Sequence, residues 1–305
     1  MITYSYKNSK DKEIQELSEF KAGSWIHVSN PVKNELTLLE EKFGLDAGLL
    51  KDATDENEVP RYEVEKDVLY IYMRFPPIQE ESIITSPILI AVGPNFVLTL
   101  GRNTETITDA LYKRSSYTTS QQTSLVLAIL SIINSEYQTY LRDISKKVRT
   151  STIKLEKIRN KDIIRFVIFE NVLNDFLSAL VPSSAILNHL MLGKHLPLTE
   201  HDKDIVEDLK LSNIEIIEIS KTTLRAMVNI REAYSTIVTN NLNDIIKLLT
   251  SLTVILAVPT MISSFFGMNV PMEFAQTPMM FLGIILTSIF ISVSLIVVFI
   301  KKDWI

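Results

Sequence analysis

The chain contains no cysteine among its 305 residues. This absence excludes disulfides and every zinc site built on thiolate ligands, and it leaves the redox compartment undecided. Glycine and proline are also scarce, with 8 and 11 copies, and neither occurs between residues 118 and 181. Because these two residues are the commonest helix breakers, we expect long helices in that region.

A basic excess is missing too. The chain has 31 Lys and Arg against 36 Asp and Glu, a net charge of −5. Nucleic-acid-binding domains usually carry clustered positive charge, so we expect no nucleic-acid partner. No Gly-rich phosphate loop is present, since Gly93-Pro94 and Gly101-Arg102 are typical of turns, and we expect no nucleotide partner. No Ser-His-Asp or paired-carboxylate pattern is recognisable, and we expect the protein not to be an enzyme.

Charged residues are absent from two long stretches near the C-terminus. Residues 248–272 carry none, and residues 274–300 carry none after the single Glu273. Each stretch is long and apolar enough for a helix to cross about 30 Å of hydrocarbon. Lys247 precedes the first stretch and Lys301-Lys302 follow the second, whereas the loop between them has no Lys or Arg. The positive-inside rule then places both termini in the cytoplasm. The N-terminal segment lacks an apolar core, so we expect no signal peptide.

The first 115 residues alternate between strand and helix signals. Short apolar runs at 67–74, 88–93 and 96–100 are bounded by turn residues, and Gly93-Pro94-Asn95 separates the last two at hairpin distance. Helical patterns lie at about 32–43 and 104–113. We therefore predict an α/β domain over residues 1–117, on the cytoplasmic side.

Helical periodicity dominates from about Thr118 onward. Apolar residues recur there at steps of three and four, as in Leu125, Ile129, Ile132, Ile133 and Tyr137. Pro182 and the segment 193–197 are the expected breaks, and residues 118–197 are predicted to form a cytoplasmic long-helix hairpin.

A second helical run follows Pro197. Thr199 is a suitable N-cap with acidic residues in the first turn, and no Gly or Pro occurs before Pro259. One helix of more than 60 residues is therefore predicted within 198–268, continuing into the first membrane span. Helices of this length imply contacts between copies of the chain, because one small domain cannot bury them.

One face of this long helix carries small and polar side chains. Steps of three or four residues give Glu232, Thr236, Thr239, Asn243, Ile246, Leu249, Thr253, Ala257, Thr260 and Ser264. Small and hydroxyl residues allow close packing of membrane helices, and a pore face needs the same residue types, so spacing alone leaves both interpretations open. Ile246 and Leu249 interrupt the stripe at the membrane entrance. In a pore they would form a hydrophobic ring that gates by dewetting.

The tripeptide Gly267-Met268-Asn269 ends the first of the two terminal spans. In this position it resembles the signature of the CorA family of magnesium/cobalt channels. Phe266 stands where the family has an aromatic residue, residues 246–250 resemble the family's start of the first span, and residues 301–304 resemble its basic tail. Over residues 198–305 the resemblance rests on sequence motifs. Over the preceding residues it rests only on the architecture, an α/β domain followed by long helices.

The resemblance implies a funnel-shaped homopentamer in the cell (inner) membrane, surrounded by lipid. Residues 198–268 of each copy would form a stalk helix continuing into the pore-lining span, residues 269–278 an outer loop, and residues 279–305 the second span with a basic cytoplasmic tail. Gly267, Met268 and Asn269 would form the selectivity filter, with Asn269 holding a hydrated ion. The pore lining would comprise Glu232, Asn243, Ile246, Leu249, Thr253, Ala257, Thr260 and Ser264, with Ile246 and Leu249 as the gate.

The implied cargo is Mg²⁺, with Co²⁺ or Ni²⁺ as further substrates. Mg²⁺ gives up its water reluctantly, and a ring of neutral Asn269 amide oxygens can hold the hydrated ion through its water. Glu273 in the outer loop would attract cations toward the mouth. Ala257 stands where some relatives carry a bulky methionine, which weakens that constriction.

The resemblance also implies closure by intracellular Mg²⁺, which bridges acidic residues of neighbouring cytoplasmic domains. Asp52 and Asp208 match the positions of this regulatory metal site. The sequence departs from the family pattern at Lys51, Leu211 and Ser212, so feedback closure is open to question.

Two other functions compete with this interpretation. A ZntB-like Zn²⁺ transporter coupled to protons has the same architecture and the same tripeptide. A protein of another class, a membrane-anchored divalent-cation sensor without flux, would need neither the polar stripe nor the tripeptide. His189, His195 and His201 are spaced by six and do not share a helix face, so we expect no histidine metal site.

Overall fold

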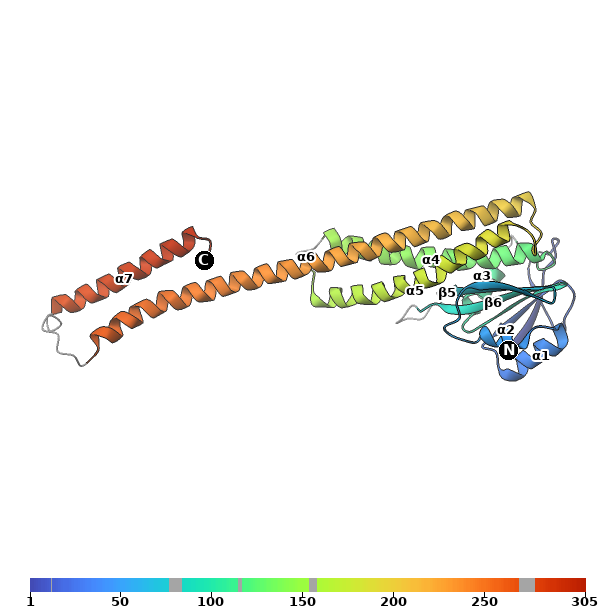
Figure 1. Ribbon diagram of the computed structural model, residues 1–305, viewed down its shortest axis with the longest axis horizontal. Coiled ribbons are helices and arrows are strands. Elements are labelled where there is room, and N and C mark those ends of the chain that lie inside the picture. Colours follow the sequence, from blue (N-terminus) through green and yellow to red (C-terminus); the bar gives the residue numbers. More distant parts are fainter. Residues whose placement is uncertain (12, 77–83, 115–116, 154–157, 269–277) are drawn as a thin grey trace. The chain divides into compact units, whose positions relative to one another are not determined.

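The computed structural model describes residues 1–11, 13–76, 84–114, 117–153, 158–268 and 278–305. The chain divides into two compact units, Met1–Asn229 and Ile230–Ile305 (Figure 1). The first unit combines a sheet with long helices, and the elements described in the second unit are helices. The finer domain division expected from the sequence stays a prediction.

The first unit contains a mixed sheet of seven strands in the order β2-β1-β3-β7-β6-β5-β4. Their bounds are β1 Ile2–Tyr6, β2 Gln15–Leu17, β3 Ser24–Ser29, β4 Arg61–Glu65, β5 Val68–Phe75, β6 Ser86–Gly93 and β7 Phe96–Gly101. β3 pairs with β7 in parallel, and all other neighbours are antiparallel. The predicted strands β5, β6 and β7 and the β6–β7 hairpin are confirmed. β1, β2 and β4 are only partly buried, which explains their weaker apolar signal.

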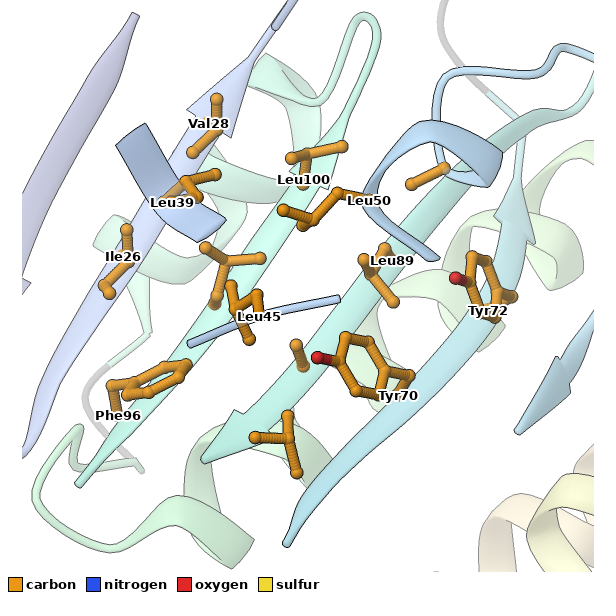
Figure 2. Close-up of a cluster of buried hydrophobic side chains, with 14 residues drawn as sticks. Ile26, Val28, Leu39, Leu45, Leu50, Tyr70, Tyr72, Leu89, Phe96 and Leu100 are labelled. Atoms are coloured by element: carbon orange, nitrogen blue, oxygen red, sulfur yellow. The ribbon is translucent and has the colours of Figure 1, made fainter. Parts of the chain in front are cut away.

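Helices cover both faces of this sheet, which is why the central strands β5, β6 and β7 are buried along almost their whole length. On one face, α1 (Lys33–Phe43) and α2 (Ala47–Asp52) contribute Leu39 and Leu50 to a core with Tyr70, Leu89 and Leu100 (Figure 2). α3 (Glu105–Lys113) packs on α4 (Gln122–Ile153). α4 contacts β5 and β7, and α5 (Asn160–Met191) contacts β4 and β5. The predicted helices near 32–43 and 104–113 are thus confirmed.

Pro182, which the sequence analysis expects to break a helix, lies inside α5, so that prediction is wrong. A proline removes one backbone hydrogen bond and strains the preceding turn. Around Pro182, two backbone carbonyls accept hydrogen bonds from side chains. The Ser183 hydroxyl donates to the Ala179 carbonyl at 2.7 Å, and the buried Asn213 amide donates to the Leu180 carbonyl at 3.1 Å. The expected break at 193–197 is confirmed, because α5 ends at Met191 and the next helix begins at Glu200.

That next helix, α6, runs without interruption from Glu200 to Phe266, a length of 67 residues. Thr199 and Asp202 cap its start reciprocally: the Asp202 N–H donates to the Thr199 hydroxyl oxygen at 3.2 Å, and the Thr199 N–H donates to the Asp202 carboxylate at 2.9 Å. The predicted N-cap and the predicted long helix are both confirmed.

The second unit contains the last part of α6 and helix α7 (Pro278–Lys301). Both helices are long and apolar enough to cross a membrane, and only 6% of the most apolar window of each is buried. A core helix of a soluble domain would be mostly covered by the rest of the chain, so the low burial favours membrane spans.

Candidate functional site

Every residue that the sequence assigns to a pore face is exposed along α6. This holds for Glu232, Asn243, Ile246, Leu249, Thr253, Ala257, Thr260 and Ser264. Ser251, which lies half a helical turn from Leu249, is by contrast fully buried, and Ser288 of α7 is 9% exposed. The chain therefore covers another side of α6 and leaves the polar stripe free.

Part of this stripe forms a groove of about 750 Å³ on α6. Its polar lining comes from the expected residues Thr253, Thr260 and Ser264, and the expected residue Ala257 lies among them. Leu256, Met261, Phe265 and Met268 add apolar walls. Sequence reasoning missed Leu256, Met261 and Phe265, although each lies one helical step beside a stripe residue.

The threonine hydroxyls of the stripe donate to carbonyls of their own helix. Thr253 Oγ1 donates to the Leu249 carbonyl at 2.8 Å, and Thr260 Oγ1 donates to the Leu256 carbonyl at 2.9 Å. Because the proton is used inside the helix, the lone pairs of each oxygen remain available as acceptors. A row of such oxygens suits a hydrated cation, whose outer surface consists of water hydrogens.

The tripeptide begins where α6 ends. The Gly267 N–H still donates to the Ser263 carbonyl at 2.9 Å. Gly267 is not among the residues with positive φ, so it does not adopt a left-handed conformation. A Cβ at this position would lie 3.2 Å from the Ser263 carbonyl oxygen, which is a tight contact with the backbone. Met268 is exposed, and Asn269 and Glu273 lie outside the described residues.

Asp52, one of the two expected regulatory acids, is held by an arginine. Arg61 Nη2 lies 2.8 Å from Asp52 Oδ2, and the same guanidinium binds Glu58 and Glu63. It also lies over the ring of Tyr72, 4.2 Å from the centroid. Burial works against the charge of Arg61, but its hydrogen bonds to Glu63 and Asp52 hold its pKa above the ordinary value. A metal ion at Asp52 must therefore compete with Arg61, whose role sequence reasoning missed.

Asp208, the other expected regulatory acid, is exposed on α6 and has no ion pair among the described residues. Ser212, four residues further along, accepts hydrogen bonds from Asn134 and Gln138 of α4, each at 2.7 Å. This departure from the family pattern thus joins α6 to α4. Within the described part of the chain, no group of three or more His, Asp or Glu side chains could hold a metal ion.

Two of the three histidines between residues 189 and 201 share a pocket, although their spacing did not predict it. His189 at the end of α5 and His195 in the following loop line a cavity of about 240 Å³ with Tyr62 of β4. Tyr62 Oη lies 3.0 Å from His189 Nδ1, and the pocket floor is formed by Leu69, Ile186, Leu190 and Leu196. His201 does not line it.

Comparison with known proteins gives a family match over nearly the whole chain. The family described as CorA-like Mg²⁺ transporter protein matches residues 20–302. The cobalt/magnesium transport protein CorA of Methanocaldococcus jannaschii is 26% identical over 290 residues, which cover 92% of this chain and 91% of that protein.

Solved structures agree on the fold. The complete structure of the CorA magnesium transporter from Methanocaldococcus jannaschii superposes with a TM-score of 0.81 at 22% identity, covering 100% of this chain and 99% of that one. The cytoplasmic domain of ZntB from Vibrio parahaemolyticus matches with a TM-score of 0.65 at 11% identity, covering 78% of this chain and 99% of that one. The expected fold class, an α/β domain followed by long helices and two C-terminal apolar helices, is confirmed.

Proposed function

This chain belongs to the CorA family of transporters, and from that premise we propose that it conducts Mg²⁺ across the cell membrane as a homopentamer. Co²⁺ and Ni²⁺ would be additional cargo; the similar archaeal protein is a cobalt/magnesium transporter. The observation that carries the proposal is the exposed polar stripe of α6. The stripe runs into the part of the same helix that is long and apolar enough to span a membrane. Both termini would lie in the cytoplasm.

In this assembly five copies of α6 surround the pore. The acceptor oxygens of Thr253, Thr260 and Ser264 would receive hydrogen bonds from water bound to the ion, so the ion crosses without losing its full hydration shell. At the outer end, Gly267, Met268 and Asn269 would form the filter. Conduction requires binding weak enough for release, and neutral oxygens meet that requirement better than carboxylates.

The gate would lie at the cytoplasmic end of the span. Ile246 and Leu249 are 51% and 57% exposed, which is high for large apolar side chains and leaves them free to meet their counterparts from other copies. A narrow ring of such side chains expels water and stops a hydrated ion. Asn243 and Glu232 would line the neck below the gate, and Glu232 would concentrate cations there.

No chemical energy source is required for uptake. The inside-negative membrane potential supplies about 4.6 kcal/mol for a divalent ion crossing 100 mV, twice the value for a single charge. We propose that intracellular Mg²⁺ closes the pore by joining Asp52 of one copy to Asp208 of its neighbour. The Arg61–Asp52 ion pair would weaken this feedback, because Mg²⁺ must displace the guanidinium.

A second candidate function is Zn²⁺ transport coupled to protons. The cytoplasmic domain of ZntB shares the fold of this chain, but at 11% identity that likeness does not distinguish Zn²⁺ transport from Mg²⁺ transport. A non-conducting divalent-cation sensor is less well supported, because a sensor has no use for an exposed row of acceptor oxygens in a membrane helix.

The test is Mg²⁺ influx into proteoliposomes that contain a Mg²⁺-sensitive dye, with the wild type compared with Asn269→Ala. Loss of influx in Asn269→Ala, with Asn241→Ala on the exposed part of α6 as the matched control, would support the proposal. If the wild type carries no Mg²⁺, the same vesicles are tested with Zn²⁺ and a pH gradient. Flux under those conditions would assign the protein to zinc transport, and no flux of any divalent ion would favour the sensor.

A further inference from the structure

The free end of the α4–α5 hairpin is strongly basic. Between Arg142 and Arg165 the sequence has nine Lys and Arg against three Asp and Glu, although the whole chain has a net charge of −5. Seven of these cations lie among the described residues, and all seven are exposed: Arg142, Lys146, Lys147, Arg149, Arg159, Lys161 and Arg165. Such a concentration of one charge produces a local positive potential that attracts anions.

Most of this charge is not used inside the chain. Lys147 Nζ lies 2.5 Å from Asp143 Oδ2 and 5.8 Å from the centroid of the Phe169 ring. The other six cations have no ion pair with any carboxylate in the part of the chain that the structure describes. Their charge does not stabilise the hairpin through pairing, so it is available for a ligand.

Three of the cations converge on one groove. It has a volume of about 410 Å³ and lies between the last turns of α4 and the first turns of α5. Lys146 and Lys147 line it from α4, and Arg165 lines it from α5. Ammonium and guanidinium groups are the usual protein partners of phosphate oxygens, and Arg can bind two of those oxygens at once.

Two carboxylates line the same groove, Asp143 and Asp162. Asp162 also accepts the backbone N–H of Arg159 at 3.1 Å, which caps the start of α5. These groups offset part of the positive charge that the groove presents to a simple anion. Two carboxylates are too few to hold Mg²⁺ alone, but Mg²⁺ in proteins is commonly bound by one or two carboxylates together with the phosphates of a ligand.

We propose that this groove binds a soluble phosphate-bearing anion as its Mg²⁺ complex. The phosphate oxygens contact Lys146, Lys147 and Arg165, while the metal ion lies between the phosphate and the carboxylates of Asp143 and Asp162. The hydroxyls of Thr150 and Ser151 donate to the Lys146 and Lys147 carbonyls at 2.8 and 3.1 Å, so their oxygens can accept hydrogen bonds from water on the metal. The groove shares no residue with the proposed pore face, so its binding can be tested without measuring transport.

The test is calorimetric titration of inorganic pyrophosphate into the full chain in nanodiscs of neutral lipid, with Mg²⁺ at the same concentration in cell and syringe. The double variant Lys146→Gln/Arg165→Gln is expected to bind at least about tenfold more weakly, because it loses contacts to phosphate. The matched control Arg142→Gln/Arg149→Gln removes the same charge from outside the groove and is expected to bind nearly as the wild type does.

Three results would overturn the proposal. Equal weakening in both double variants would mean that only the diffuse field attracts the anion. Pyrophosphate binding that is as strong in EDTA as in Mg²⁺ would show that no metal ion takes part in the site. Loss of pyrophosphate binding in nanodiscs of anionic lipid would assign the groove to lipid headgroups instead of a soluble ligand. Size-exclusion profiles matching the wild type show that each variant is folded.

Discussion

Arg61 is paired with Asp52, with Nη2 of the arginine 2.8 Å from Oδ2 of the aspartate, and it also binds Glu58 and Glu63. Asp52 is one of the two acids proposed to sense intracellular Mg²⁺. In the proposed sensor the arginine and the metal ion would compete for the same carboxylate. An ion pair on the sheet edge would then affect how sensitively the channel responds to Mg²⁺.

Replacing Arg61 by Gln is expected to make the channel close at lower intracellular Mg²⁺. The pair is partly exposed, so its loss changes the free energy by only about 0.2–1 kcal/mol, which lowers the half-inhibiting concentration up to about fivefold. The measurement is Mg²⁺ current in membrane patches at graded internal Mg²⁺. Arg102→Gln, which breaks the exposed pair with Glu56, is the matched control. An unchanged inhibition curve for Arg61→Gln would show that Asp52 does not bind the inhibiting Mg²⁺.

Leu249→Ser is expected to raise Mg²⁺ flux several-fold under closing conditions, because a polar ring no longer expels water from the gate. Leu248→Ser is the control, since Leu248 is similarly exposed but points about 100° away around the helix. Flux into dye-loaded vesicles that hold high internal Mg²⁺ measures the leak. Equal leaks in the two variants would place the gate elsewhere.

Thr260→Val is expected to reduce Mg²⁺ flux by about two- to tenfold, because the substitution keeps the side-chain shape and removes one hydrogen-bond acceptor per copy, worth about 0.5–1.5 kcal/mol. Thr287→Val on α7 is the control. Its hydroxyl makes the same internal bond, to the Gly283 carbonyl at 2.8 Å, but it lies on the other span. If both variants transport alike, the hydroxyl row does not contact the ion.

The stability of the first unit is expected to fall as the pH decreases from about 6.5 to 4. Burial lowers the pKa of His27 from 6.5 to about 4, and the ring is held neutral between Thr99 and Thr108, each at 3.0 Å. In this pH window the unfolded chain binds a proton that the folded chain does not, so acid favours unfolding by roughly 3 kcal/mol at the lower end.

His27→Gln is expected to flatten this pH dependence, whereas His201→Gln on the exposed start of α6 leaves it unchanged. Denaturant unfolding at pH 4, 5, 6 and 7 gives the comparison. Fluorescence of Trp25 is a local reporter, because its ring lies 5.3 Å from that of His27. A pH profile of His27→Gln that matches the wild type would show that other groups cause the acid sensitivity.

The sequence by itself determined the elements whose signals are local. The two apolar stretches, the Thr199 cap and the absence of Gly and Pro before Pro259 predict α6 and the membrane spans, because charge, capping and helix propensity act within a few residues. The polar stripe was also readable, since a helix of fixed pitch decides which residues share a face.

Pro182 marks where local rules gave the wrong result. Proline predicts a break, but Asn213, 31 positions further along, donates to the Leu180 carbonyl and to the Ser184 hydroxyl and supports the helix from outside. Only the folded chain brings Asn213 to that place, so no pattern around residue 182 could reveal it.

Contacts between distant segments were decided by tertiary structure alone. β3 and β7 pair in parallel, Tyr62 is hydrogen-bonded to His189, which lies 127 positions away, and Arg61 forms an ion pair with Asp52. Such contacts form because burying the two faces of the sheet fixes the order of its strands. The sequence therefore determined what each element is and how far it runs, whereas packing decided which charged and polar side chains meet and which stay exposed.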